Sequence, residues 1–173
     1  MLIRREAPGD ESAIRRVHAE AFAPLHPGGQ PVEPRLVDDL RVSDAFLGAL
    51  SLVALADGEV TGHVCCSRAT LLPGGHPVVG LGPLGVRPSH QRQGVGGALM
   101  HAVLGAADAL DEPLVVLLGH PDFYPRFGFR PAAEIGVEPE HPEWAPHFQA
   151  RTLTRHRPEL RGRFRYAQPF HDL

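Results

Sequence analysis

Three glycines and the polar residues before them have the types and spacing of a phosphate-binding turn. Gly94-Val95-Gly96-Gly97 follows Gln91-Arg92-Gln93, and the apolar residues after it recur with a helical period of about 3.6. The first amides of a helix have no partners within it and lie at the positive end of its dipole. Glycines leave room for an anion beside those amides, and Arg92 adds a permanent positive charge. A helix start selected for stability alone explains the glycines poorly, because each costs about 0.5–1 kcal/mol relative to alanine.

Such a turn needs a strand before it and a helix after it, and the sequence predicts both. Val78–Val86 is an apolar, partly β-branched run that ends just before Pro88. The helix is expected over Gly94–Leu110, and a second apolar strand over Leu114–Leu118. Since a helix separates these two strands, we expect them to be parallel neighbours in one sheet.

A second segment, downstream of these strands, carries a tyrosine in a distinctive setting. Gly119–Phe129 places Tyr124 shortly after the strand and just before the pair Gly128-Phe129. Together with Gln91–Gly96 it resembles the acyl-CoA-binding region of the GNAT superfamily of N-acetyltransferases, whose motif reads Gln/Arg-x-x-Gly-x-Gly/Ala. The resemblance covers about residues 50–131, and the two segments occur in the order that the family has.

The resemblance implies that the cofactor is acetyl-CoA, bound mainly by backbone groups. A backbone N–H of the strand, at Leu84 or next to it, would polarise the thioester carbonyl, and the amides of the turn would bind the pyrophosphate. The cofactor-binding residues implied in this way are Leu84, Gly85, Val86, Gln91, Arg92, Gln93, Gly94, Val95, Gly96 and Gly97.

Tyr124 is the one catalytic residue that the resemblance implies. A phenol with a pKa near 10 can give its proton to the departing thiolate. The alternative is a tyrosine that only packs in the core beside neighbouring phenylalanines. Many family members carry a glutamate on the central strand as a base, but Val78–Val86 contains no acid; His120 is the nearest candidate by sequence, and no base is assigned. The resemblance also makes His26 and Glu33, between the first two helices, candidates for contact with the acceptor; the alternative for each is a solvated loop residue.

The fold class implied is α/β with a mixed sheet, the GNAT acyl-CoA N-acyltransferase fold. It has a mostly antiparallel central sheet, a parallel pair of fourth and fifth strands splayed around the cofactor, and helices on both faces. We expect one domain over residues 1–173, with residues 160–173 as a C-terminal tail. Further elements expected from the sequence are a strand Leu2–Arg5, a helix from Glu11 with Asp10 as N-cap, a helix Pro34–Val42, strands Leu50–Ala56 and Val60–Ala69 joined by Asp57-Gly58, and strands Ala132–Glu138 and Phe148–Leu153.

Composition excludes several other classes of protein. The net charge of −3 argues against nucleic acid as the main partner, and no apolar run reaches the roughly 18 residues of a membrane span. The opening residues lack the apolar stretch of a signal peptide, so we expect a cytoplasmic protein. The chain has no lysine, which excludes a Walker A loop and Schiff-base chemistry.

Two further patterns do not carry chemistry. The G-x-G-x-x-G run at Gly80–Gly85 is interrupted by Pro83 and continues as strand, so it is not a dinucleotide site. The histidines lack the H-E-x-x-H spacing, and Cys65 and Cys66 are adjacent, so no metal is expected; both cysteines, and His18 on the first helix, are expected to be buried packing residues.

The sequence therefore predicts an acetyl-CoA-dependent N-acetyltransferase acting by direct transfer in a ternary complex. The acceptor could be a small-molecule amine, an amino acid or a peptide, with no nucleic acid or membrane partner; a homodimer stays open. One alternative is a non-catalytic acyl-CoA-binding sensor or regulatory domain, which would not need Tyr124. A nucleotide-binding domain is disfavoured by the interrupted glycine run.

Overall fold

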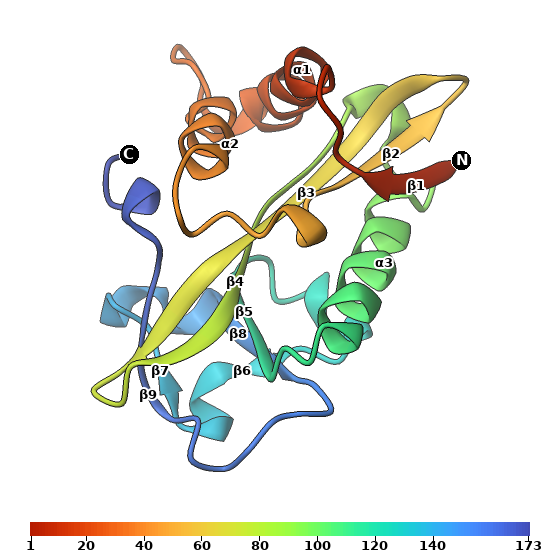
Figure 1. Cartoon of the computed structure of the whole chain (residues 1–173). Helices are drawn as coiled ribbons and strands as arrows, with labels where there is room; N and C mark the ends of the chain where they lie inside the picture. The colour runs from red at the N-terminus through yellow and green to blue at the C-terminus, as the bar shows by residue number, and fades with distance from the viewer.

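The computed structural model describes residues 1–173, and a mixed nine-stranded sheet runs through its centre (Figure 1). In chain order the strands are β1 (Leu2–Arg5), β2 (Leu52–Ala56), β3 (Glu59–Leu72), β4 (His76–Val86), β5 (Leu114–Leu118), β6 (Arg130–Pro131), β7 (Val137–Glu138), β8 (Phe148–Thr152) and β9 (Gly162–Arg165). The helices are α1 (Glu11–Phe22), α2 (Glu33–Arg41) and α3 (Val95–Ala109), with short 3₁₀ turns between elements. No helix is long and apolar enough to span a bilayer.

The first four strands form an antiparallel meander, in agreement with the mostly antiparallel sheet that the sequence implies. The order β1-β2-β3-β4 continues through β5, β8 and β6, and only β4 and β5 are parallel within that path. Asp57 and Gly58 join β2 to β3 with φ angles of 51° and 83°, both left-handed, as a two-residue hairpin requires. The predicted topology and hairpin are therefore confirmed.

Helices cover both faces of the sheet, α1 and α2 on one side and α3 on the other (Figure 1). Successive residues of a strand point to opposite faces, and β2 shows the consequence. Leu52 and Ala54 pack in one cluster with Leu99 of α3, whereas Val53 between them packs with Ile14 of α1. The implied two-sided arrangement is thus confirmed, and the fold is that of the α/β class with a mixed sheet.

β4 and β5 separate after a short parallel pairing. They pair only at Val79–Val115 and Gly80–Val116, although β4 continues to Val86. Opposite β3, β4 places Gly82 and Pro83 against the single residue Cys65, and a bulge of this kind bends a strand. The remainder of β4 therefore keeps β3 on one edge and has no strand on the other.

Asp10 is the N-cap residue of α1, as predicted, and its carbonyl accepts from the amide of Ile14 at 2.9 Å, but its side chain makes no capping bond. The carboxylate instead forms a two-bonded ion pair with Arg4, at 2.6 and 2.9 Å, and accepts from the amide of Ala7.

One local prediction was wrong. The predicted strand Ala132–Glu138 is instead a 3₁₀ turn that ends at left-handed Gly136, followed by the two residues of β7. Cys65 and Cys66 are buried as expected.

Candidate active site

A large cavity lies where β4 and β5 diverge. Its volume is about 1440 Å³, above the roughly 300–1,000 Å³ typical of small-ligand sites. The walls come from the end of β4, the start of α3, the segment after β5, the α1–α2 region and the C-terminal residues. The cavity therefore has room for a large cosubstrate and a second molecule together.

The glycine turn presents six consecutive backbone donors that have no partner in the protein. The first backbone bond of α3 runs from the amide of Ala98 to the carbonyl of Gly94, at 2.9 Å, and the amides from Arg92 to Gly97 make none. Arg92 and Gly94 are left-handed, with φ of 59° and 85°, and Gln93 between them is not. Alternation of this kind turns successive N–H groups toward one concave, anion-binding side. The positive end of a 15-residue helix adds to the attraction.

The side chains of the turn brace it or face the cavity. Gln91 and Gln93 donate to the carbonyls of Val86 and Ser89, at 3.0 and 2.9 Å. Gly96 lines the cavity, and a Cβ there would meet Phe123 and Val86 only at 3.7 Å. The protein itself therefore leaves the space at Gly96 open. The lining residues from the predicted cofactor set are Leu84, Gly85, Val86, Gln91, Arg92, Gly94, Gly96 and Gly97.

Two members of the predicted cofactor set do not line the cavity. Val95 is buried in the main core, and the Gln93 side chain points to Ser89. What these two residues offer an anion is their backbone N–H alone.

Tyr124 lies across the cavity on the segment after β5. Its ring covers Gly119 so closely that a Cβ there would lie 2.3 Å from Tyr124 Cε2. The ring also meets Phe123 and Phe129 edge-on, with centroids 4.9 and 5.8 Å apart. Burial raises the pKa of Tyr124 to about 12, and its hydroxyl has no hydrogen-bond partner. Tyr124 thus packs among aromatic rings and also lines the cavity.

A further part of the cavity wall, called its C-terminal end below, carries carboxylates and aromatic rings. Glu33 at the start of α2 lies 3.5 Å from His26, and its Oε2 is buried with no hydrogen bond. The C-terminal tail, whose pairing the sequence does not reveal, brings Tyr166 and Phe170 here, stacked at 4.4 Å. Glu140 also lines this end and accepts from the amide of Tyr166 at 3.1 Å. Carboxylates beside ring faces suit a cation.

Sequence reasoning missed this C-terminal wall, although one signal was available. Aromatic residues concentrate in the last part of an otherwise charged tail, and such residues need a surface to pack on. His120, named as the nearest base by sequence, does line the cavity; its ring lies 6.3 Å from that of His147.

Comparisons with known proteins agree on one family. Residues 14–129 match the model of the Acetyltransferase (GNAT) family. The chain is 34% identical over 166 residues to the "Uncharacterized N-acetyltransferase YjhQ" of Escherichia coli K12, covering 92% of this chain and 88% of that protein.

Two solved structures show the same fold with the cofactor. A GNAT family acetyltransferase from Brucella melitensis in complex with acetyl-CoA has a TM-score of 0.79 and 33% identity, covering 98% of this chain and 97% of that chain. YhbS from Escherichia coli, in complex with CoA, has a TM-score of 0.87 and 30% identity, covering 98% and 91%. Fold, cavity and sequence likeness together lead to one conclusion: the chain belongs to the GNAT family of acetyltransferases.

Proposed function

We propose that this protein transfers an acetyl group from acetyl-CoA to a primary amine, directly, within a ternary complex. The observation that carries the proposal is that one cavity is lined by Arg92, Gly94, Gly96 and Gly97, whose amides are unpaired, and by Tyr124, whose hydroxyl is unpaired. The amides suit the pyrophosphate, with Arg92 adding charge. The acetyl-CoA and CoA bound by the two solved relatives support this cofactor.

The free edge of β4 has the position needed to hold the reacting thioester. Leu84, Gly85 and Val86 pair with β3 on one side, and their other edge faces the cavity. A backbone N–H of Leu84 or its neighbour polarises the carbonyl there; one preorganised donor of this kind is worth roughly 2.7–4 kcal/mol in other enzymes.

The chemistry is one displacement at the carbonyl carbon. The amine lone pair forms the C–N bond, the C–S bond breaks, and the thiolate takes a proton from Tyr124. Since the pKa of Tyr124 is raised to about 12, the phenol is protonated throughout the neutral range, although the same rise makes it a weaker acid than an exposed tyrosine.

The acceptor enters from the end lined by Glu33, Glu140 and the C-terminal rings. These groups favour an ammonium attached to an apolar or aromatic body, whether in a small molecule, an amino acid or a peptide. No lysine in the chain can compete with the acceptor for the acetyl group.

Calorimetric titration with acetyl-CoA tests the cofactor site, using Gly96→Glu and a matched control, Gly105→Glu. Both variants add the same charge to α3, but Gly105 lies in the exposed body of the helix, away from the turn. We expect wild-type and Gly105→Glu protein to bind and Gly96→Glu to lose binding. Equal binding by all three would refute the site.

Release of free thiol with a panel of amines tests catalysis. The panel is phenethylamine, spermidine, leucine amide and trialanine. We expect turnover with at least one, and Tyr124→Phe should slow it about tenfold or more without weakening acetyl-CoA binding. Saturable binding with no turnover on any amine would instead support the acyl-CoA sensor.

A further inference from the structure

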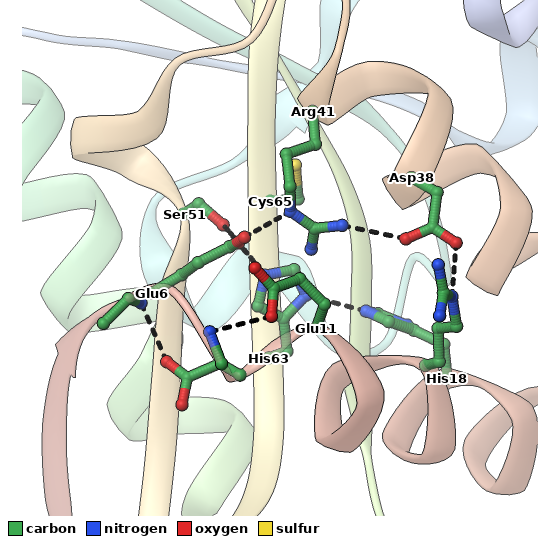
Figure 2. Close-up of polar contacts among 12 residues, drawn as sticks. Glu6, Glu11, His18, Asp38, Arg41, Ser51, His63 and Cys65 are labelled. Atoms are coloured by element: carbon green, nitrogen blue, oxygen red, sulfur yellow. Dashed lines mark hydrogen bonds and ion pairs between the residues drawn. The ribbon is translucent and has the colours of Figure 1, made fainter.

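A chain of four polar side chains, three of them fully buried, lies between α1 and the sheet (Figure 2). His18 Nε2 lies 2.8 Å from His63 Nδ1, and His63 Nε2 lies 2.9 Å from Ser51 Oγ. Ser51 donates to Glu6, whose Oε2 is also 3.5 Å from His63 Nε2. Arg41 donates to the other oxygen of Glu6. His18, His63 and Ser51 are fully buried.

The partners fix the position of every proton in this chain. Glu6 is ionised and can only accept, so the Ser51 hydroxyl points its hydrogen at it. Ser51 Oγ and Glu6 must then receive the Nε2–H of His63, which leaves His63 Nδ1 as an acceptor. His63 Nδ1 in turn receives the Nε2–H of His18. The Nδ1 of His18 therefore carries a lone pair and no proton.

That lone pair is the one end of the chain without a partner. His18 Nδ1 is buried and makes no hydrogen bond. It abuts Gly85 of β4, where a Cβ would lie 2.8 Å away, and the ring of Phe22 stacks on His18 with centroids 5.8 Å apart. Gly85 and Phe22 thus lie against the His18 ring and also line the cavity, as does Ala21 beside Gly85.

An unpaired buried acceptor has a cost that a packing role does not explain. Leaving one costs about 1–3 kcal/mol, which an apolar residue would avoid. The fold also lacks an acid on β4, so the amine has no base on the strand nearest the thioester. The unpaired Nδ1 of His18 on α1 therefore lies against the strand that carries no acid to act as a base.

We propose that His18 is the general base of the acetyl transfer, and that His63, Ser51 and Glu6 position it and stabilise the charge it gains. The inference rests on the proposed function. As the C–N bond forms, the amine N–H bond breaks and its proton goes to His18 Nδ1, while the Nε2 proton of His18 moves to His63 Nδ1. The positive charge then lies on His63, facing the Glu6 carboxylate, as a buried acid stabilises an imidazolium in hydrolase triads.

Proton balance is complete within this scheme. One proton leaves the nitrogen and one reaches the sulfur from Tyr124. The enzyme returns to its starting state when the histidine pair loses a proton to solvent and the phenolate of Tyr124 gains one. Access for the amine requires Phe22 to rotate, and contacts of this kind commonly tighten only in the substrate complex.

The surroundings keep both histidines neutral in the resting protein. Burial, with His63 and Arg41 nearby, lowers the pKa of His18 well below its usual value. Burial also lowers the pKa of His63. Glu6 and Asp10 act to raise this pKa, and Arg41 acts to lower it further. A lowered pKa means that the lone pair persists as the pH falls below 6.5, where an exposed histidine would be protonated.

The first test is the pH profile of thiol release with the amine that the wild type acetylates fastest in the panel above. His18→Ala should lower kcat about 100-fold at pH 7 and make log kcat rise by about one per pH unit, as hydroxide replaces the base. Added imidazole should restore part of the rate. Ser51→Ala should lower kcat and leave the KM for acetyl-CoA unchanged, and His76→Ala, at the β3–β4 turn, is the matched control.

A second test uses the wild-type protein and so does not depend on the folding of a variant. Long-range ¹⁵N–¹H spectra of the imidazole rings should show neutral His18 and His63 as Nε2–H tautomers, both becoming protonated at lower pH than an exposed histidine. Protonated Nδ1 on the neutral His18 ring would overturn the inference, as would full rate and an unchanged pH profile in His18→Ala. Failure of the wild type to acetylate any amine would overturn the proposed function and this inference together.

Discussion

Gly85→Ala is the most direct perturbation of the contact between β4 and the buried histidine pair. Gly85 has no left-handed φ, so alanine suits its backbone, but the new Cβ would lie 2.8 Å from His18 Nδ1 and 3.1 Å from its Cε1. His18 is fully buried and held by a 2.8 Å bond to His63, so its ring cannot move aside freely.

The size of the effect follows from these contacts. Overpacking of a core typically costs about 1–3 kcal/mol, and a weakened hydrogen bond adds about 1 kcal/mol. Replacing glycine by alanine also lowers the conformational entropy of the unfolded chain, which stabilises the folded state by about 0.4–1 kcal/mol. We expect a net loss of about 2 kcal/mol, which lowers the melting temperature by about 4–8 °C in a chain of this size.

A double-mutant cycle in urea isolates the contact. Once His18→Ala has removed the ring, the nearest remaining atom to the Cβ introduced by Gly85→Ala is Ala21 Cβ at 3.5 Å, an ordinary contact. Gly85→Ala should therefore be neutral or stabilising in the His18→Ala background, giving a coupling energy of about 2 kcal/mol or more. Equal losses in both backgrounds, with coupling below about 0.5 kcal/mol, would refute the reasoning.

Four other substitutions have defined outcomes. Gly119→Ala should displace the Tyr124 ring, whose Cε2 would lie 2.3 Å from the new Cβ, and thiol-release assays should show kcat falling as in Tyr124→Phe. Although burial acts to raise the pKa of Glu6, bonds from its neighbours lower it to about 2. The Glu6 carboxylate therefore stabilises the fold above pH 4.5, by up to about 3 kcal/mol. Urea unfolding should show a higher free energy of unfolding for wild type than for Glu6→Gln at that pH. The difference should vanish as the pH falls from 4.5 to 2. Gly94→Ala should destabilise the fold by about 1–2 kcal/mol, because Gly94 is left-handed. Gly105→Ala, inside α3, should stabilise it by about 0.5–1 kcal/mol, and thermal unfolding of both variants measures the two effects.

The parts of the site that sequence could predict are those encoded by neighbouring residues. The turn Gly94 to Gly97 and the segment around Tyr124 can be recognised from the sequence. Helix starts and aromatic turns depend on only a few adjacent side chains. The bounds of β1 and β5 agree with the sequence prediction for the same reason. β3 runs past the predicted Ala69 to Leu72 because its last residues pair with β9, far along the chain.

The buried chain of polar side chains could not be predicted because its members come from four separate segments. Glu6, His18, Ser51 and His63 share no spacing that a helix or strand period would reveal. One signal was available: a histidine between Gly62 and Val64, inside an apolar strand, cannot be buried without a partner. That rule indicates that a partner exists but not which residue it is.

The length of β3 has a consequence for the order of folding. Its first half pairs with β2, whereas Thr70 to Leu72 pair with β9, and Gly162 approaches so closely that a Cβ there would lie 2.0 Å from the Leu72 carbonyl. Until the C-terminal segment arrives, the end of β3 keeps unpaired backbone groups, and the hydrophobic cluster around Phe164 stays open. An exposed edge of this kind can pair with another chain. Truncation before β9 should therefore produce aggregation or strand exchange between molecules rather than a smaller stable enzyme.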